Sequence, residues 1–440
     1  MKILFISLGC DKNLVDTEVM LGLLASRGYE MTDDERQADI IVINTCCFIH
    51  DAKEESIQNI LEMAEYKKSG QVKALIVTGC LAQRYRQEIL DEIPEVDEVL
   101  GTTAYDKILD VVDRALEGEQ GIILSDLNAL PVSGAKRLVT TGGHFAYLKI
   151  AEGCDKHCTY CIIPKIRGNF RSVPMERLIK EAKELAEQGV KELILVAQET
   201  TLYGKDLYGE KCLHRLVEEL CKIAGIRWIR ILYCYPEEIT DELIEVIKKV
   251  PKVCHYLDLP IQHASDSILK RMGRRTSKQE LTDIVKKLRK EIPDICLRTT
   301  LITGFPGETE DQHEELMQFV DEMEFDRLGV FTYSPEEDTP AAVMPDQIAE
   351  EVKEERQADL MELQQEIAFD NAENMIGREM LVMIEGKVAD ENAYVGRTYR
   401  DAPNVDGLIF INTEEELISG DFAKVKITGA LEYDLIGELL

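Results

Sequence analysis

Three closely spaced cysteines constrain this chain of 440 residues more than any other feature. Cys154, Cys158 and Cys161 form a C-x3-C-x2-C motif directly after the apolar run Tyr147–Ala151, which we expect to be a strand. Three thiolates in one strand-to-helix loop can bind three irons of a [4Fe–4S] cube. The fourth iron would then stay open to another ligand.

Two other kinds of metal site use similar cysteine motifs. Zinc sites favour paired C-x2-C motifs or nearby histidines, and a ferredoxin-type cluster favours a fourth cysteine close by. The sequence around Cys154 has neither pattern. The spacing resembles the signature of the radical S-adenosylmethionine (SAM) superfamily. That resemblance implies that SAM binds the open iron through its amino and carboxylate groups and is reductively cleaved to a radical.

Composition limits where the protein works and what it binds. The sequence has 83 acidic and 51 basic residues, a net charge of −32, which disfavours non-specific nucleic-acid binding and suits a basic partner. Simple solubility would explain the acidity as well. The apolar start Met1–Cys10 is too short for a signal peptide, and no run reaches the ~20 apolar residues of a membrane span. We expect a cytoplasmic protein without a membrane partner, whose twelve cysteines serve metal or redox chemistry more than disulfides.

The first 117 residues alternate short apolar runs with amphipathic stretches, which predicts a doubly wound parallel sheet in an α/β domain. The expected strands are Lys2–Leu8, Ile40–Asn44 and Ala74–Thr78, and the expected helices are Val15–Arg27 and Lys53–Lys68. Residues 118–140 contain Pro131 and Ser133 and have weaker periodicity, so we expect a linker there.

Residues 140–370 repeat the strand–helix alternation at longer spacing. Six units in series predict an open, partial (β/α)6 barrel. The expected strands are Tyr147–Ala151, Glu192–Ala197, Trp228–Tyr233, Tyr256–Pro260, Leu297–Thr303 and Leu328–Tyr333, and the clearest helices are Met175–Gln188 and Ser277–Lys290. A long charged helix over Asp346–Met375, with Pro345 at its start, is expected to lead out of the barrel.

Residues 373–440 change to short β-type runs broken by Gly, Asn and Asp, which predicts a small antiparallel β-barrel. The expected strands are Leu381–Ile384, Ala393–Arg397, Gly407–Ile411 and Phe422–Thr428.

A second set of cysteines is dispersed along the first domain. Cys10, Cys46 and Cys80 each follow one of its three apolar runs. A single cysteine at a strand end is usually a small core residue. Three at equivalent ends should converge, because parallel strands share one carboxyl edge where ligands collect. We therefore predict a second three-thiolate iron–sulfur site.

The whole chain resembles the radical-SAM methylthiotransferases. The resemblance rests, in order, on SLGCDKNLVDTE, NTC, TGC, the C-x3-C-x2-C motif and a terminal barrel of the TRAM type. It implies that Cys10, Cys46 and Cys80 bind a first [4Fe–4S] cluster that handles the inserted sulfur. Cys154, Cys158 and Cys161 would bind the second, and SAM would supply both the methyl group and the 5′-deoxyadenosyl radical. Cys47 departs from the family, which has a small non-ligand residue there; it is either a substitute ligand or a buried neighbouring thiol.

Two branches of this family differ in substrate. One modifies an adenosine of tRNA, and the other adds a methylthio group to the β-carbon of an aspartate of ribosomal protein S12. The start SLGCDKNLVDTE, the segment Leu259–Ser265 with His263, and the segments Val395–Thr398 and Asp401–Gly407 resemble the ribosomal-protein branch.

Charge also separates the two branches. Residues 377–440 contain six basic and thirteen acidic side chains, a net charge of −7, although this could simply follow the acidity of the chain. An RNA-binding domain should be basic, whereas an acidic one suits a basic ribosomal protein. We therefore disfavour tRNA as substrate. A reducing electron donor and a sulfur donor would also be required, and a non-catalytic iron–sulfur carrier or sensor is the alternative of another class.

Other residues could contact SAM. The segment Thr300–Glu308 resembles the superfamily's adenosine-binding segment, so we name Gly304 and Gly307, although a tight turn would also explain these glycines. Gln198 and Glu199 end the second barrel strand and could bind the methionine end of SAM. Tyr160 could pack near the adenine.

Several polar or thiol side chains have simpler interpretations. Thr200 could be a ligand contact or a helix N-cap. His157 and His263 could ligate or carry protons, but we favour ordinary polar contacts. The remaining cysteines are expected to be core thiols: Cys212, Cys221, Cys234, Cys254 and Cys296.

Overall fold

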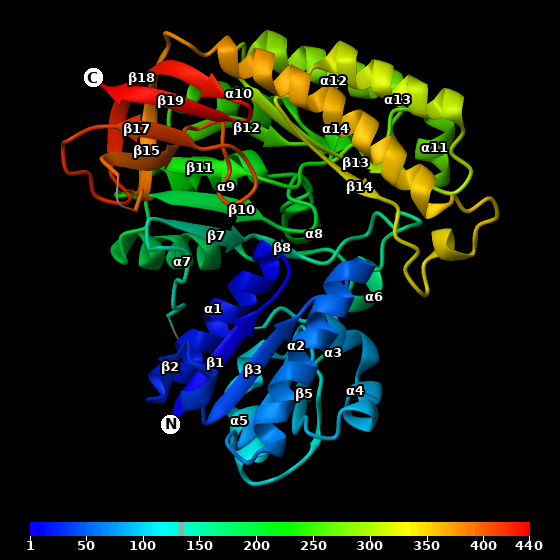
Figure 1. Cartoon of the computed structure of the whole chain (residues 1–440), viewed down its shortest axis with the longest axis vertical. Coiled ribbons are helices and arrows are strands. Elements are labelled where there is room, and N and C mark those ends of the chain that lie inside the picture. Colours follow the sequence, from blue (N-terminus) through cyan, green and yellow to red (C-terminus); the bar gives the residue numbers. More distant parts are fainter. Residues whose placement is uncertain (132–135, 390) are drawn as a thin grey trace.

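The computed structural model describes residues 1–131, 136–389 and 391–440. Three sheets follow one another along the chain. The first sheet occupies the lower part of Figure 1, the central sheet lies above it, and the C-terminal barrel is packed beside the central sheet. The short strand β8 (Ala151–Glu152) and helix α6 (Ile163–Arg167) lie where the first two parts meet (Figure 1).

The first sheet has six parallel strands in the order β2-β1-β3-β4-β5-β6. The chain adds β2 on one side of β1 and all later strands on the other, which makes the sheet doubly wound as predicted. The strands are β1 (Lys2–Ser7), β2 (Glu30–Thr32), β3 (Ile40–Thr45), β4 (Ala74–Gly79), β5 (Glu98–Leu100) and β6 (Gly121–Ile123).

Helices cover both faces of this sheet because its strands are apolar on both sides. One buried cluster joins the sheet to α1 and α5, and another joins it to α2, α3 and α4. The helices are α1 (Asp11–Ser26), α2 (His50–Lys68), α3 (Cys80–Tyr85), α4 (Gln87–Glu92) and α5 (Ile108–Leu116).

Three strands of the sheet were missing from the sequence prediction. β2, β5 and β6 have three residues each, too few for a periodic pattern. The linker prediction is wrong where β6 lies, because Gly121–Ile123 pairs with β5 and completes the first sheet. Residues 132–135 of that expected linker, including Ser133, lie outside the described residues.

The central sheet has six parallel strands in the order β14-β13-β12-β11-β10-β7. Every strand lies beside its successor, and the two end strands are not neighbours, so the predicted open barrel is confirmed. The strands are β7 (Phe145–Lys149), β10 (Glu192–Val196), β11 (Trp228–Ile231), β12 (Val253–Asp258), β13 (Cys296–Thr303) and β14 (Arg327–Thr332). A two-stranded sheet pairs β8 with β9 (Arg171–Ser172).

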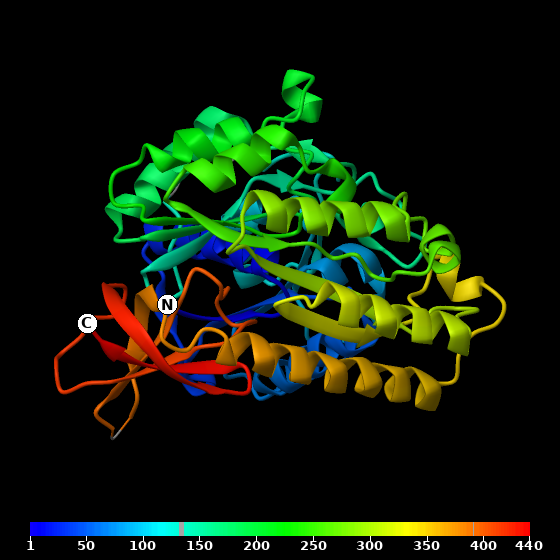
Figure 2. The ribbon, with the colours of Figure 1, turned by 90° about the horizontal axis from the view of Figure 1, so that it is seen from above.

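Helices of the core pack on the outer face of the central sheet. They are α7 (Met175–Glu187), α8 (Lys205–Tyr208), α9 (Leu213–Cys221), α10 (Asp241–Lys249), α11 (Asp266–Arg271), α12 (Lys278–Glu291), α13 (Glu310–Met323) and α14 (Glu350–Glu373). Helix α8 is the exception, because none of its four described residues is buried and it contacts β9. Figure 2 shows α14 running beside α13 toward the C-terminal barrel. Helix α14 begins five residues after Pro345, so the expected start at Asp346 is wrong. Asp346 has φ of 62° and accepts a hydrogen bond from the Gly307 amide, which makes this segment a turn.

The C-terminal strands close into the predicted small barrel, in the order β15-β16-β17-β19-β18. The expected antiparallel pattern is wrong for one pair, because β17 and β19 run parallel. The strands are β15 (Glu379–Lys387), β16 (Ala393–Arg397), β17 (Ile409–Asn412), β18 (Phe422–Leu431) and β19 (Asp434–Leu439).

A buried charge cluster joins this barrel to the central sheet. Glu192 of β10 accepts hydrogen bonds from Arg230 at 2.8 Å and from Arg397 of β16 at 2.7 Å, and all three side chains are buried. The two guanidinium groups lower the pKa of Glu192 although burial opposes this. No described helix is long and apolar enough to cross a membrane.

Replacing Glu192 should therefore weaken the contact between the two domains. We expect Glu192→Gln to lower the free energy of unfolding of the metal-free protein by about 3–5 kcal/mol, because it leaves the buried Arg230 without a carboxylate. It also leaves Arg397 with Glu385 alone. Since the folded pKa of Glu192 lies below the ordinary 4.5, this contribution is present above that pH and is lost as the pH falls through the folded value.

Urea unfolding at pH 7 and pH 4 tests this expectation. Asp421→Asn is the matched control, because Asp421 pairs with Lys191 across the same two domains at the surface. That exposed pair should contribute no more than about 1 kcal/mol. Equal losses for the two variants would contradict the role given to Glu192.

Candidate metal centres

The first three cysteines meet at the carboxyl edge of the first sheet. Cys10 follows β1 and caps α1, Cys46 follows β3, and Cys80 follows β4 as the first residue of α3. β1 and β3 flank the point where the strand order reverses, which is where open α/β sheets bind ligands. The structure thus brings together three residues separated by 36 and 34 positions in the sequence. We call them the first triad.

Two glycines let the loops of the first triad approach one another. Gly9 has φ of 85°, and a Cβ there would lie 2.6 Å from the Cβ of Cys46. Gly79 has φ of 92°, and a Cβ there would lie 2.3 Å from the side-chain oxygen of Asn44. Both positions exclude a side chain by space and by backbone conformation.

Asn13 connects all three loops of the first triad. Its amide nitrogen donates to the Leu8 carbonyl at 3.1 Å and to the Thr45 carbonyl at 3.0 Å. Its oxygen lies 3.8 Å from the Cys80 sulfur. Asn13 is fully buried one turn beyond Cys10, so one side chain fixes the spacing of the three cysteines.

Burial favours the protonated thiols of Cys46 and Cys80. Burial, with Cys80 and Cys10 nearby, raises the pKa of Cys46 to about 12. Burial also raises the pKa of Cys80, although the guanidinium of Arg167 opposes this rise. Cysteine binds metal as the thiolate, so metal binding would release these protons.

The other cysteines lie in apolar surroundings, as predicted. Cys47 is completely buried in the cluster between the first sheet and helices α2 to α4, which supports the interpretation as a neighbouring buried thiol. The remaining five pack in the central core: Cys212, Cys221, Cys234, Cys254 and Cys296.

The second triad, Cys154, Cys158 and Cys161, occupies the loop between β8 and α6. Cys154 and Cys158 are buried, and Cys161 is half-buried. The loop is held by bonds from the Cys154 amide to the Gly168 carbonyl at 3.1 Å and from the Thr159 amide to the Met272 carbonyl at 2.9 Å. Burial raises the pKa of Cys154 to about 12.

Aromatic and charged groups surround the second triad. The Tyr235 hydroxyl lies 3.8 Å from the Cys158 sulfur, and the Arg274 guanidinium lies 4.3 Å from the centre of the Tyr235 ring. Lys156 lies 3.9 Å from Glu199 and 2.5 Å from Glu238. Sequence patterns missed Tyr235 and Arg274, which are distant from the cysteines in the sequence, and Lys156, which occupies one of the unspecified positions of the C-x3-C-x2-C motif.

Glu199 and Gln198 behave differently at the end of β10. The buried Glu199 carboxylate accepts from Thr201 through one oxygen, and its other oxygen, 3.9 Å from the Lys156 ammonium, has no hydrogen-bond partner among the described residues. Burial raises the pKa of Glu199 to about 7. Gln198 already uses both ends of its amide, since it accepts from Gly153 at 2.9 Å and donates to Glu152 at 2.9 Å. Gln198 therefore supports the cysteine loop.

Protein groups fill the space beside the two glycines expected to contact SAM. A Cβ at Gly304 would lie 2.2 Å from Lys353, and one at Gly307 would lie 2.3 Å from Arg271. Close packing thus accounts for both glycines, as the turn interpretation allowed. Tyr160 packs edge-on against Phe305, with ring centres 6.5 Å apart.

The remaining polar residues have structural partners. Thr200 donates to the Leu232 carbonyl at 2.7 Å and precedes no helix directly, so its N-cap interpretation is wrong. His263 is buried and accepts from the Ser265 amide at 2.9 Å, and burial lowers its pKa to about 3. His157 has φ of 52° and helps the cysteine loop to turn.

The two triads have the chemistry of iron–sulfur ligands. Across the described part of the chain, no group of three or more His, Cys, Asp or Glu side chains is arranged to hold a metal ion. A cubane makes a different demand, because each thiolate binds its own iron at a separate corner. Three cysteine side chains at one sheet edge, and three more in one short loop, fit that demand.

Family comparisons divide the chain into the same three parts. Residues 2–101 match the model described as "Uncharacterized protein family UPF0004", residues 148–320 match the radical SAM superfamily, and residues 376–440 match the TRAM domain.

Full-length relatives carry one shared name. The chain is 68% identical over 437 residues to "Ribosomal protein uS12 methylthiotransferase RimO" of Lachnoclostridium phytofermentans, covering 99% of both chains. It is 50% identical over 440 residues to the protein of the same name from Clostridioides difficile, covering 100% of this chain and 99% of that one.

Solved structures share the fold at low sequence identity. The radical SAM methyltransferase TsrM of Kitasatospora setae is 14% identical, with a TM-score of 0.56 over 78% of this chain and 77% of that one. The cobalamin-dependent SAM radical enzyme OxsB is 14% identical, with a TM-score of 0.52 over 83% of this chain and 56% of that one.

Removing the Asn13 side chain should disturb the first triad. We expect Asn13→Ala to lower the free energy of unfolding of the metal-free protein by about 1–3 kcal/mol. The Leu8 and Thr45 carbonyls lose the amide that donates to them, and the buried Arg167 guanidinium loses the Asn13 oxygen to which it donates. Urea denaturation measures this loss. Asn59→Ala is the control, because Asn59 makes one exposed bond to its own helix. Equal stability of the two variants would show that Asn13 does not hold the loops.

Proposed function

The chain belongs to the family of ribosomal protein uS12 methylthiotransferases, and we propose that it adds a methylthio group to the β-carbon of an aspartate in that protein. The observation that carries the proposal is 68% identity to a uS12 methylthiotransferase over nearly the full length of both chains. The two cysteine triads, at the edges of adjoining sheets, supply the ligands that this chemistry needs.

We assign the first triad, Cys10, Cys46 and Cys80, to one [4Fe–4S] cluster, and the second triad to another. With SAM bound, the two clusters would supply an electron, a 5′-deoxyadenosyl radical and the methylthio group. In each triad the fourth iron corner would be left without a thiolate. Asn13 would keep the three loops of the first triad in register, and the bond from Gly153 to Gln198 would hold the second loop in place.

Glu199 and Tyr160 are the best-placed contacts for SAM. The unpartnered oxygen of Glu199 is available to accept from an ammonium group, and Lys156 would balance its charge. Tyr160 offers an aromatic face beside the cysteines. Gln198, Gly304 and Gly307 would act indirectly, through the protein contacts that they already make.

The acidic C-terminal barrel supports a basic protein as partner over tRNA. Its net charge of −7 over residues 377–440 would steer a lysine- and arginine-rich protein toward the enzyme and repel RNA phosphates. We further propose that the enzyme acts in the cytoplasm, where it would draw on a reducing electron donor and a sulfur donor.

Iron content tests the two-cluster assignment. After anaerobic reconstitution the protein should hold about eight irons per chain, since each cube contains four. Changing all three residues of either triad to Ala should leave about four, because the other triad has its own ligands. Colorimetric iron analysis measures this. A triad variant that kept all its iron would refute the assignment for that triad.

Substrate choice tests the proposed function itself. Given SAM and a sulfide source, the reduced, reconstituted enzyme should replace one hydrogen of uS12 with a methylthio group and leave tRNA unchanged, as measured by mass spectrometry of both. Modification of tRNA alone would place the enzyme in the other branch. Absence of 5′-deoxyadenosine would instead favour a carrier or sensor.

A further inference from the structure

A buried cluster of four charges joins the first domain to the radical SAM core. Asp16 of α1 faces Lys149 of β7, Glu152 of β8 and Arg167 of α6, and we call these residues the interdomain charge cluster. Arg167 donates to Asp16 at 2.8 Å and lies 3.5 Å from Glu152, while Lys149 donates to Glu152 at 2.7 Å and to Asp16. All four side chains are at least nine-tenths buried.

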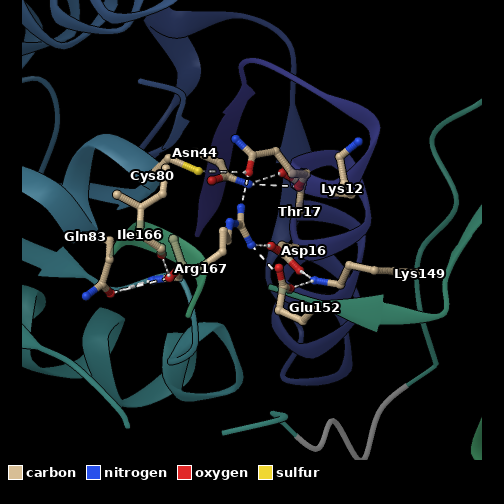
Figure 3. Close-up of polar contacts among 12 residues, drawn as sticks. Lys12, Asp16, Thr17, Asn44, Cys80, Gln83, Lys149, Glu152, Ile166 and Arg167 are labelled. Carbon is tan, nitrogen blue, oxygen red and sulfur yellow. Dashed lines mark hydrogen bonds and ion pairs between the residues drawn. The ribbon is translucent and has the colours of Figure 1, made fainter. Parts of the chain in front are cut away.

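Figure 3 shows Arg167 reaching from α6 toward Asp16 and Glu152. The two positive and two negative charges balance, so each group has a partner of opposite sign. Burying such a cluster stabilises a fold only weakly, because desolvation cancels most of the attraction. Its planar, directional bonds do restrict how the two domains can be oriented.

One end of the cluster reaches the first triad. Arg167 also donates to the side-chain oxygen of Asn13. That same oxygen lies 3.8 Å from the Cys80 sulfur, and the Asn13 amide holds the loops that lead to Cys10 and Cys46. A residue of the radical SAM core thus contacts the side chain that sets the geometry of the first triad.

The other end reaches the second triad. Glu152 accepts from Gln198, and Gln198 accepts from the amide of Gly153, the residue before Cys154. Arg167 itself ends the short helix that begins two residues after Cys161. Its neighbour Ile166 accepts from Thr102 of the first domain at 2.9 Å, so α6 is attached to that domain by a second bond.

From this continuous path we propose that Arg167 is a positioning residue that sets the alignment of the two triads. The inference rests on the proposed function, in which sulfur held at one triad must meet a substrate radical generated at the other. Lysine at this position would keep the charge and lose the planar fork that binds Asp16 and Asn13 together. The domains would then stay folded with the triads misaligned.

The experiment compares wild type, Arg167→Lys and Arg167→Gln as full-length, anaerobically reconstituted enzymes. Iron should stay near the wild-type content in the lysine variant, because every cysteine ligand is present. The ratio of 5′-deoxyadenosine to methylthio-uS12 should rise by about tenfold to a hundredfold, since a small misplacement of reacting groups has effects of that size. The glutamine variant should raise the ratio further. Lys191→Gln, which removes an exposed contact between the central sheet and the C-terminal barrel, should leave the ratio unchanged.

Calorimetry of the metal-free proteins supplies a readout independent of turnover. Wild type should unfold in one transition, and the Arg167 variants should unfold in two, because the attachment of the first domain to the core is weakened. An unchanged product ratio in Arg167→Lys would overturn the proposal. The proposal would also be overturned if 5′-deoxyadenosine and the methylthio product both fell in the same proportion as the iron content, because Arg167 would then serve cluster assembly alone. A wild-type enzyme that fails to modify uS12 would refute the proposed function, whereas these outcomes concern only Arg167.

Discussion

The carboxyl ends of parallel strands lie at one edge of a sheet, and the chemistry of this protein depends on that constraint. The strands form because apolar runs such as Ile40–Thr45 and Ala74–Gly79 are buried on both faces. The loops that leave them have to cross the same edge, so Cys10, Cys46 and Cys80 converge there without any local motif. The second triad lies at the corresponding edge of the central sheet, with all three cysteines in one loop.

Buried charges as well as apolar clusters join the domains. Glu192 joins the central sheet to the C-terminal barrel through Arg230 and Arg397, and Asp16 joins the first domain to the core through Arg167 and Lys149. Apolar surfaces tolerate sliding, whereas a buried carboxylate that loses its guanidinium carries a large penalty. Such charge clusters restrict how neighbouring domains can be oriented.

Much of the fold could be predicted because its signals are local. The helix Met175–Glu187, the strand Ala393–Arg397 and the six barrel strands follow from periodicity in short windows. Strands β2, β5 and β6 could not be predicted, since three residues form no pattern and gain their stability from neighbours. The start of α14 was missed because Asp346 is held in a turn by the amide of Gly307, a contact made across the fold.

The sequence by itself determined the succession of two parallel sheets and a small barrel, and the family, because strand periodicity and cysteine spacing are local features of the sequence. Only the tertiary structure decided what surrounds the cysteines of the two triads. It placed Asn13 among three loops, filled the space beside Gly304 and Gly307 with protein, and used Gln198 to support a loop. It also paired Arg167 with a residue 151 positions away. These partners do not follow from local sequence, because buried charges and amides need hydrogen-bond partners and the fold supplies them from distant parts of the chain.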